Sequence, residues 1–273
     1  MSGGLLRSLL FAGATRPDLV SKLERSGADA VVIDLEDAVP AAAKDEARAA
    51  LPALVESIGS TPVLVRINDA ASAWFADDLE AVAALSLAGV VVPKAEKESD
   101  LTSVAERLDD GTIVLAGIES ARGVAASEQL LEAGAGACYF GAEDYIADLG
   151  GRRSAGGDEV LYARSRVALA ARLAGIPALD QVVIDFRDDL VFAADAEAGR
   201  AIGYRGKLCI HPSQVPIANR VFAASEEELR RARGMLAAWE EGSSRGVAAV
   251  EFEGEMVDGP AVRMARDTLE RAG

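Results

Sequence analysis

The sequence predicts an α/β protein folded as a (β/α)8 TIM barrel with a C-terminal helical extension. The chain has 273 residues, half of them are hydrophobic, and eight short apolar runs alternate with segments rich in Ala, Leu, Glu and Arg. An α/β barrel typically uses about 250 residues as a single domain. Continuous apolar runs are typical of parallel strands that are buried on both faces. A doubly wound open sheet is the main alternative, but no Gly-x-Gly-x-x-Gly motif follows the first apolar run.

The eight apolar runs are the predicted strands, in chain order. They are Ser8–Phe11, Ala30–Asp34, Pro62–Ile67, Gly89–Pro93, Thr112–Ile118, Ala137–Phe140, Leu179–Ile184 and Lys207–His211. The segments between the runs have the spacing of helices with one apolar face. Between the third and fourth runs, this face consists of Trp74, Leu79, Val82, Ala83 and Leu85. The segment Gly150–Glu159, after the sixth run, is predicted to be a long loop.

The end of the chain provides the predicted extension. We expect the barrel to cover residues 1–212 and the extension to cover residues 213–273. The extension contains a charged helix at about Ser225–Glu241, a segment interrupted by glycines, and a final short helix. It is too small for an independent domain, so we expect it to pack on the barrel or on a neighbouring subunit.

The composition indicates which binding partners and which cellular compartment to expect. The chain has 28 Lys and Arg against 44 Asp and Glu, a net charge of −16, which argues against binding to nucleic acid or to an anionic membrane. Cys138 and Cys209 lie in apolar runs and are expected to be buried thiols in a reducing cytosol. The apolar start from Leu5 to Phe11 is too short for a membrane span and lacks the features of a signal peptide, so we expect a soluble cytoplasmic protein.

Polar residues follow most of the predicted strands. The carboxyl ends of all barrel strands meet at one face, so these residues are expected to form the rim of an active site. The strand ends are Asp34-Leu35-Glu36-Asp37, Arg66-Ile67-Asn68-Asp69, Pro93-Lys94-Ala95-Glu96, Glu119-Ser120, Gly141-Ala142-Glu143-Asp144 and His211-Pro212-Ser213-Gln214. Carboxylates without cysteine or paired histidine favour Mg²⁺ over Zn²⁺. Spacing alone does not select which two carboxylates would bind the metal.

A set of motifs lies in order along nearly the whole chain. The motifs are VVIDLEDAV (31–39), AxKxxAR (42–48), VRIN (65–68), VVPKAE (91–96), GIESARG (117–123), FGAEDYIADLG (140–150), GKLCIHPSQ (206–214) and EFEGEMVDGP (251–260). In these motifs the chain resembles the citrate lyase β-subunit-like branch of the HpcH/HpaI aldolase family. One departure is Ala12-Gly13, where the family commonly has Pro-Gly before a loop that contacts coenzyme A.

The resemblance implies a Mg²⁺-dependent enzyme that acts on a 3-hydroxyacyl-coenzyme A thioester. It assigns Glu119 and Asp144 as metal ligands and Arg66 as the contact to substrate oxygens. An ion pair of Arg66 with Asp34 or Asp37 is the structural alternative. It also implies a lid around Asp258, which would close over a neighbouring subunit's barrel and supply the general base. Asp258 could otherwise simply begin the turn at Gly259-Pro260.

The remaining site residues have weaker assignments. Glu36 and Asp37 are candidates for catalysis and substrate binding, where they would orient metal-bound water, and Glu143 is a candidate for the same supporting role. Arg16, Lys44 and Arg48 are expected to form a basic patch for coenzyme A phosphates, although Arg48 equally suits a solvated helix face. His211, the single histidine, is assigned to the barrel mouth in preference to a general base.

The predicted reaction is cleavage of malyl-, citramalyl- or citryl-coenzyme A to an acyl-coenzyme A and a 2-oxo acid. The alternatives are thioester hydrolysis of malyl-coenzyme A on the same site, a class II pyruvate aldolase without coenzyme A, or a subunit that acts only within a citrate lyase complex with an acyl-carrier partner. The last is not favoured, because the chain is shorter than we expect of the dedicated subunits. A homo-oligomer, either a trimer or a dimer of trimers, is implied. The sequence does not determine the acyl group of the substrate or its stereochemistry. It also does not determine whether the enzyme is a lyase or a thioesterase.

Overall fold

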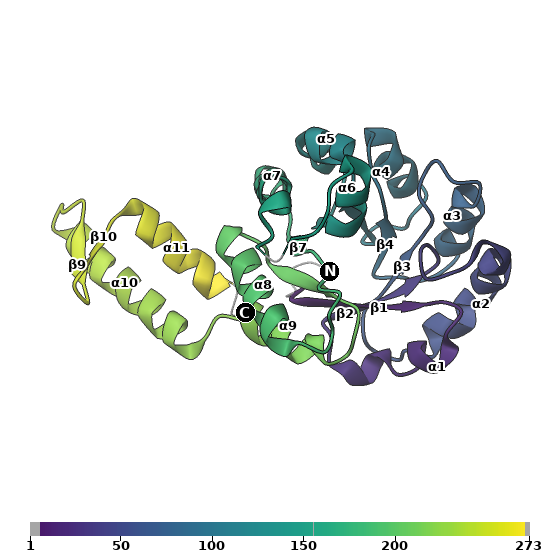
Figure 1. Ribbon diagram of the computed structural model, residues 1–273. Coiled ribbons are helices and arrows are strands. Elements are labelled where there is room, and N and C mark those ends of the chain that lie inside the picture. The colour runs from purple at the N-terminus through teal and green to yellow at the C-terminus, as the bar shows by residue number, and fades with distance from the viewer. Residues whose placement is uncertain (1–5, 155, 271–273) are drawn as a thin grey trace. The chain divides into compact units, whose positions relative to one another are not determined.

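The computed structural model describes residues 6–154 and 156–270, and within these residues eight parallel strands close into a barrel in chain order (Figure 1). Leu5 and Ala155, which the predictions above include, lie outside the described residues. The strands are β1 (Ser8–Gly13), β2 (Ala30–Asp34), β3 (Val63–Arg66), β4 (Gly89–Val92), β5 (Ile113–Ile118), β6 (Ala137–Phe140), β7 (Ala178–Asp180) and β8 (Gly206–Cys209). Each predicted run overlaps one of these strands, and the predicted fold class is confirmed.

The seventh strand is the clearest error in the predicted boundaries. The run Leu179–Ile184 was expected to be extended throughout, but β7 ends at Asp180. Asp180 is fully buried and forms ion pairs with Arg164 and Lys207. Beyond it, the Val183 carbonyl accepts a hydrogen bond from the Gln214 side chain and Ile184 is exposed. At Val183, therefore, a side chain and not a neighbouring strand satisfies the backbone carbonyl.

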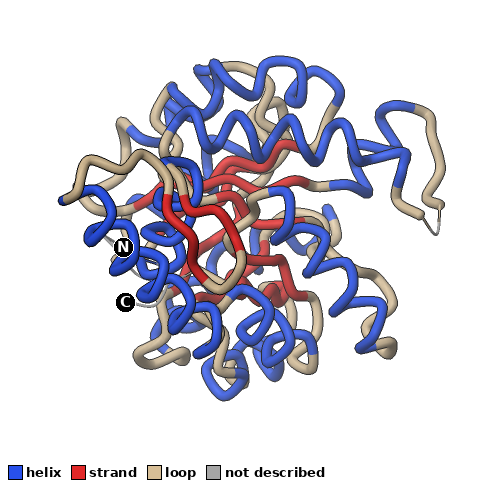
Figure 2. The backbone as a smooth tube through the Cα atoms, turned by 90° about the vertical axis from the view of Figure 1, so that its left-hand side faces the viewer, coloured by secondary structure: helices blue, strands red, loops and turns tan. Residues whose placement is uncertain are grey.

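Helices cover the outside of the barrel, as the blue and red segments of Figure 2 show. They are α1 (Pro17–Val20), α2 (Lys44–Glu56), α3 (Phe75–Ala83), α4 (Glu98–Ala105), α5 (Ala121–Glu132), α6 (Ala142–Leu149), α7 (Asp158–Ala174), α8 (Asp189–Ile202) and α9 (Gln214–Phe222), with short 3₁₀ turns at Leu23–Ser26 and Ala41–Ala43. Capping side chains fix the first residue of some of these helices. Ser120 Oγ accepts from the Gly123 N–H at the start of α5, and Asp188 caps α8. None of the described helices is both long and apolar enough to span a membrane.

Alternate residues of each strand enter two different apolar layers. One layer fills the barrel interior and includes Leu9, Val32, Leu64, Val91, Leu115, Leu179 and Leu208. The other lies between the strands and the helices, and both cysteines belong to it. Cys138 and Cys209 are buried and unpaired, as expected, and burial raises the pKa of each thiol to about 12. The interior layer forms the floor beneath the carboxyl ends of the strands.

The chain divides into two compact units, one up to Phe222 and one from Ala223. Helix α9 therefore belongs with the barrel. The second unit consists of α10 (Glu226–Ser244), a hairpin of β9 (Val250–Phe252) and β10 (Glu255–Val257), and α11 (Gly259–Glu270).

The sequence predicted both helices of the second unit but not its hairpin. The turn residues Glu253 and Gly254 both have positive φ, which suits a two-residue hairpin turn. Phe252 packs where a Cβ on Gly234 would lie, so the glycine in α10 admits the hairpin.

Candidate active site

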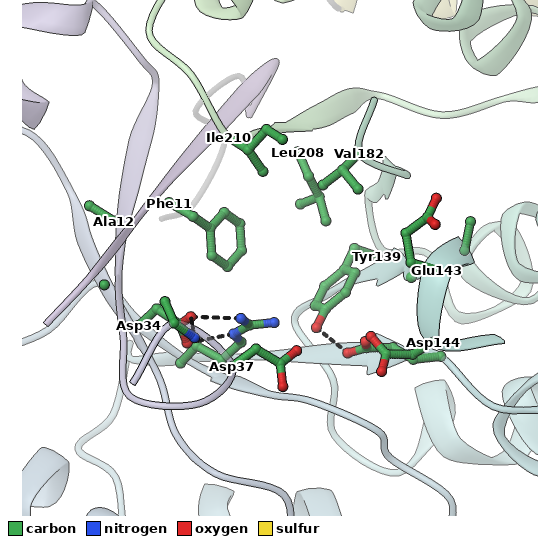
Figure 3. A pocket seen from close by; sticks show the side chains of 16 residues that line it. Phe11, Ala12, Asp34, Asp37, Tyr139, Glu143, Asp144, Val182, Leu208 and Ile210 are labelled. Atoms are coloured by element: carbon green, nitrogen blue, oxygen red, sulfur yellow. Dashed lines mark hydrogen bonds and ion pairs between the residues drawn. The ribbon is translucent and has the colours of Figure 1, made fainter. Parts of the chain in front are cut away.

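A pocket of about 460 Å³ opens at the carboxyl ends of the barrel strands. Its lining includes the predicted residues Asp37, Arg66, Glu119, Glu143 and Asp144. Figure 3 shows an apolar side made by Phe11, Val182, Leu208 and Ile210, facing a side that carries carboxylates. Residues from four of the predicted strand ends therefore line one pocket.

Arg66 is the last residue of β3, where it forms the predicted ion pair with Asp34 and lines the pocket. Its Nε and Nη2 donate to the two carboxylate oxygens of Asp34, each at 2.7 Å, and its Nη1 lies 3.1 Å from Glu36 Oε2. Burial alone would raise the pKa of Asp34, but the hydrogen bonds and charge of Arg66 outweigh burial and lower it. The ion pair with Asp34 therefore fixes a guanidinium that also lines the pocket.

Glu119 follows β5 and is almost fully buried, with 2% of its surface exposed. Its Oε1 accepts a hydrogen bond from the Tyr139 hydroxyl and a longer one, 3.3 Å, from the Lys94 N–H. Burial raises the pKa of this carboxyl to about 7, although the Tyr139 hydrogen bond and the Arg66 charge lower it. A buried carboxylate of this kind is strongly stabilised by a cation.

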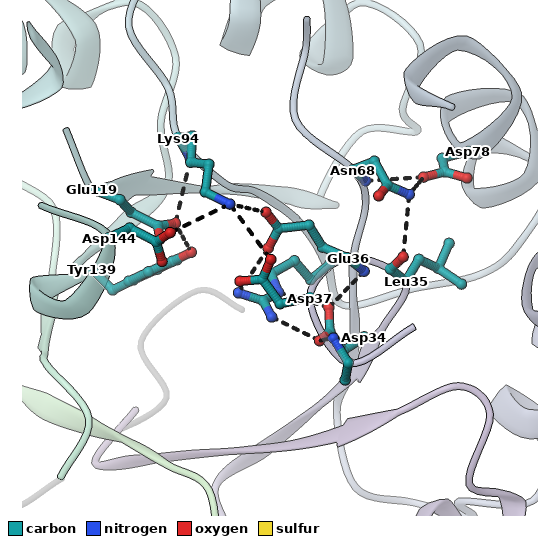
Figure 4. A network of polar contacts seen from close by, with 12 residues as sticks. Asp34, Leu35, Glu36, Asp37, Asn68, Asp78, Lys94, Glu119, Tyr139 and Asp144 are labelled. Atoms are coloured by element: carbon teal, nitrogen blue, oxygen red, sulfur yellow. Dashed lines mark hydrogen bonds and ion pairs between the residues drawn. The ribbon is translucent and has the colours of Figure 1, made fainter. Parts of the chain in front are cut away.

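Lys94 joins carboxylates that follow different strands, and the sequence analysis assigned it no role beyond its place at the rim. Its ammonium lies 2.5 Å from Glu36 Oε1, 3.6 Å from Asp37 Oδ1 and 3.5 Å from Asp144 Oδ1 (Figure 4). These ion pairs and hydrogen bonds raise the pKa of Lys94, against the effect of its burial. Its φ of 49° is unusual for a non-glycine residue, and such strain is often found at functional sites.

The pocket offers carboxylate oxygens as donors to a metal ion, and such donors suit Mg²⁺. Among the described residues, no three His, Cys, Asp or Glu side chains are arranged as a preformed metal cluster. Glu119 and Asp144 nevertheless line the same pocket, and two carboxylates with water and substrate oxygens are a common environment for Mg²⁺. Glu36 Oε2 is also buried without a hydrogen bond, because Arg66 Nη1 lies near it in poor geometry. These acidic oxygen donors fit Mg²⁺.

Lys44 corrects the predicted basic patch. Its ammonium is buried and donates to the carbonyls of Leu35 and Glu36, at 2.7 and 2.8 Å, and to Asn68 Oδ1. All three ammonium hydrogens are therefore used inside the protein, and none is available to a phosphate. Lys44 was misassigned because an amphipathic helix pattern does not show toward which neighbour a lysine at the start of a helix turns.

The other two members of the basic patch are also paired. Arg48 donates to Asp78 and Asp45, so it serves an ion-pair network on α2 and α3. Arg16 is more than half exposed and pairs with Asp18. Of the three, Arg16 is the one that reaches solvent freely enough to meet a phosphate.

Two further rim residues have defined surroundings. Glu143 lines the pocket and forms an ion pair with Arg153, at 3.1 Å. His211 stacks on Phe186, and its Nδ1 accepts from the Ser213 N–H at 3.2 Å. The imidazole belongs to the barrel mouth but is not part of the pocket lining.

Asp258 lies in the second unit and begins α11. Its Oδ1 accepts a hydrogen bond from the Ala261 N–H, at 3.2 Å, so locally it acts as a helix cap. A catalytic role for Asp258 stays a prediction.

Comparison with known proteins identifies similar chains. A family model described as HpcH/HpaI aldolase/citrate lyase matches residues 7–212. A citrate lyase subunit beta-like protein of Deinococcus radiodurans is 50% identical over 275 residues, covering 97% of this chain and 96% of that one. A (3S)-malyl-CoA thioesterase of Cereibacter sphaeroides is 32% identical, with 97% and 94% covered. The crystal structure of CitE from Mycobacterium tuberculosis with magnesium, acetoacetate and coenzyme A matches with a TM-score of 0.81 and 36% identity, covering 100% and 99% of the two chains.

Proposed function

Because the chain belongs to the HpcH/HpaI aldolase/citrate lyase family, we propose that it is a carbon–carbon lyase that cleaves a 3-hydroxyacyl-coenzyme A to an acyl-coenzyme A and a 2-oxo acid. The substrate is of the malyl, citramalyl or citryl type. The observation that carries the proposal is the meeting of Glu119, Asp144 and Arg66 in one pocket. Glu119 and Asp144 would hold Mg²⁺. When bound, Mg²⁺ supplies a Lewis acid for the oxygens of the 2-oxo acid.

Arg66 would contact the substrate oxygens that gain negative charge. Asp34 occupies Nε and Nη2, so the guanidinium is held in one orientation and its Nη1 edge is the part that would donate to substrate. A donor that is already oriented needs no reorganisation as charge develops in the transition state. Glu36 lies beside Nη1 and would orient water at the same place.

The proton steps require a base for the substrate hydroxyl. We assign this role to Asp258 of a neighbouring subunit. When Asp258 accepts the hydroxyl proton, the carbon–oxygen double bond of the 2-oxo acid forms and the adjacent carbon–carbon bond breaks. Its electron pair remains on the acyl-coenzyme A as an enolate, which then takes up a proton. Exposed Arg16 would contact the coenzyme A phosphates.

Hydrolysis of malyl-coenzyme A is the second candidate, favoured by the similarity to the Cereibacter thioesterase. The same pocket would then bind the thioester, and Asp258 would activate water in place of the substrate hydroxyl. The two reactions share their binding residues and differ in which bond is broken.

Product analysis distinguishes these functions. The purified protein would be incubated with Mg²⁺ and a panel of 3-hydroxyacyl-coenzyme A thioesters, followed by chromatography of the products. Glyoxylate, pyruvate or oxaloacetate identifies the lyase substrate, whereas free malate identifies the thioesterase. Pyruvate formed from a 4-hydroxy-2-oxo acid that contains no coenzyme A would indicate an aldolase. Turnover that begins only when an acyl-carrier protein is added would indicate a complex subunit.

Carboxylate variants test the metal site in the same assay. Glu119→Gln and Asp144→Asn should each abolish Mg²⁺-dependent turnover, while Glu132→Gln on the exposed surface of α5 should not. Full activity of either site variant would contradict the metal assignment.

A further inference from the structure

We propose that Tyr139 is a positioning residue that orients the Glu119 carboxylate for Mg²⁺. This inference rests on the proposed function, since it needs Glu119 to be a metal ligand. The sequence placed Tyr139 within the sixth strand and assigned it no role at the site. The structure places its hydroxyl on that carboxylate.

Tyr139 belongs to the interior of the barrel. It lies in β6, only 2% of its surface is exposed, and it packs in the same apolar layer as Leu115 and Leu179. Its hydroxyl leaves this layer and donates to Glu119 Oε1, as Figure 4 shows. Because the ring is held by close packing, the hydroxyl is a donor with a fixed position.

Two glycines leave room for the Glu119 side chain. A Cβ on Gly117 would collide with Glu119 Oε1 and the Tyr139 hydroxyl. A Cβ on Gly141 would lie 2.6 Å from Glu119 Cγ and 2.7 Å from Oε2. The carboxylate therefore fits here because one glycine lies beside it in β5 and another lies directly after β6, next to a tyrosine that supplies the hydrogen bond.

The hydrogen bonds also distinguish the two oxygens of Glu119. The Tyr139 hydroxyl and the Lys94 N–H both donate to Oε1. Oε2 is therefore the oxygen that we expect to meet the cation. Partners that orient a metal ligand in this way commonly contribute a factor of about 10–100 to metal affinity.

The test is a pair of tyrosine variants measured by Mg²⁺ calorimetry. Tyr139→Phe keeps the ring but removes the donor, so we expect a Mg²⁺ dissociation constant raised about 10–100-fold. Tyr204→Phe is the matched control, because Tyr204 is also fully buried and its hydroxyl donates to the Arg164 carbonyl, 2.8 Å away and outside the pocket. The control should lose similar stability and keep wild-type Mg²⁺ affinity.

Turnover provides a second measurement. A positioning role predicts that Tyr139→Phe recovers most of its kcat at saturating Mg²⁺, because the ligand itself is still present. Wild-type Mg²⁺ affinity in Tyr139→Phe would overturn the proposal. A loss of kcat that saturating Mg²⁺ does not restore, with unchanged Mg²⁺ affinity, would also overturn the proposal, since the tyrosine would then act on substrate.

Gly141→Ala tests the same position if Tyr139→Phe does not fold. The added Cβ should displace Glu119 and weaken Mg²⁺ binding, whereas Gly151→Ala, which meets only ordinary contacts, should not. Unchanged affinity in Gly141→Ala would overturn the proposal. If the wild-type protein binds no Mg²⁺, the metal assignment of the proposed function fails and this inference fails with it. If the wild type binds Mg²⁺ and either variant matches it, only the role of Tyr139 is rejected.

Discussion

Arg66 depends on Asp34 for its orientation. Both the planar shape and the charge of its guanidinium therefore matter at this position. Two parallel hydrogen bonds of 2.7 Å hold the guanidinium against Asp34, and Phe11 lies 5.4 Å from its centre. A lysine at this position would keep the charge but could form neither the paired hydrogen bonds nor the same orientation.

We expect Arg66→Lys to lower kcat/KM about a hundredfold or more, as removal of an oriented donor does in other enzymes. Steady-state kinetics on the thioester identified by product analysis would measure this. Arg7→Lys is the matched control, because Arg7 makes the same paired contact with Asp29 before β1, at the opposite end of the barrel. Near-normal turnover of Arg66→Lys would show that Arg66 serves only as a counter-ion for Asp34.

Glu119 should couple Mg²⁺ binding to proton release. Its pKa is about 7 in the metal-free protein, so the carboxyl is largely protonated at lower pH and must lose its proton to bind metal. We therefore expect Mg²⁺ affinity to fall as the pH drops below 7. Calorimetry at about pH 6 in buffers of different ionisation enthalpy should detect released protons, and at about pH 8 it should detect almost none. Binding heat at the lower pH that does not depend on the buffer would contradict the assignment.

The same pKa has a consequence for stability. In the unfolded chain this carboxyl ionises near its ordinary value, about 4.3, whereas the folded protein retains the proton up to about pH 7. The unfolded state therefore binds fewer protons between these values, and this group makes the metal-free fold less stable as the pH rises through that window.

At the scale of elements, the connection between β2 and α2 is held by Lys44. The lysine reaches back from the start of α2 to the carbonyls of Leu35 and Glu36, which precede Asp37. Asn68 links the same lysine to Asp78 on α3. This buried network holds the rim segment that carries Glu36.

Lys44→Met should therefore destabilise the fold and not specifically weaken phosphate binding. Buried acceptors left without a donor cost roughly 1–3 kcal/mol each, so we expect a loss on the order of 3 kcal/mol in the free energy of unfolding. Urea denaturation would measure it, with exposed Lys22→Met as the control. Coenzyme A binding by the folded fraction should keep its dependence on salt. A stable Lys44→Met protein with a weaker salt dependence would restore Lys44 to the phosphate site.

At the scale of the whole molecule, the proposal that Asp258 of a neighbouring subunit supplies the base makes the proposed site depend on assembly. A closed cyclic oligomer allows each subunit to give one lid and receive one, so that every barrel is completed. The proposed trimer, or dimer of trimers, satisfies this requirement.

Mixing two inactive proteins tests this arrangement. Asp258→Asn retains its barrel and Glu119→Ala retains its lid, so after subunit exchange in equal amounts about a quarter of the sites should combine an intact barrel with an intact lid. The mixture should recover that share of activity, while each variant alone stays inactive. If labelled subunits exchange and activity remains at zero, Asp258 is not supplied by a neighbour.

The sequence by itself determined the barrel, because eight apolar runs that alternate with helical segments bury their two faces as a parallel sheet covered by helices. It also placed Arg66, Glu119 and Asp144 at one end of that barrel, since parallel strands present their carboxyl ends at the same face. Local patterns predicted α10 and α11 but not the hairpin between them, whose packing depends on a glycine in α10.

Only the tertiary structure decided which of these rim residues touch one another. Lys94 meets Glu36 and Asp144, and Tyr139 meets Glu119, because closure of the barrel brings β2, β4, β5 and β6 together. The direction of Lys44 likewise depends on the carbonyls and amide that lie within its reach. The contacts of Lys94 and Tyr139 join residues that are tens of positions apart in the chain. Residue spacing along the sequence does not predict them, because packing between elements sets the direction of each side chain.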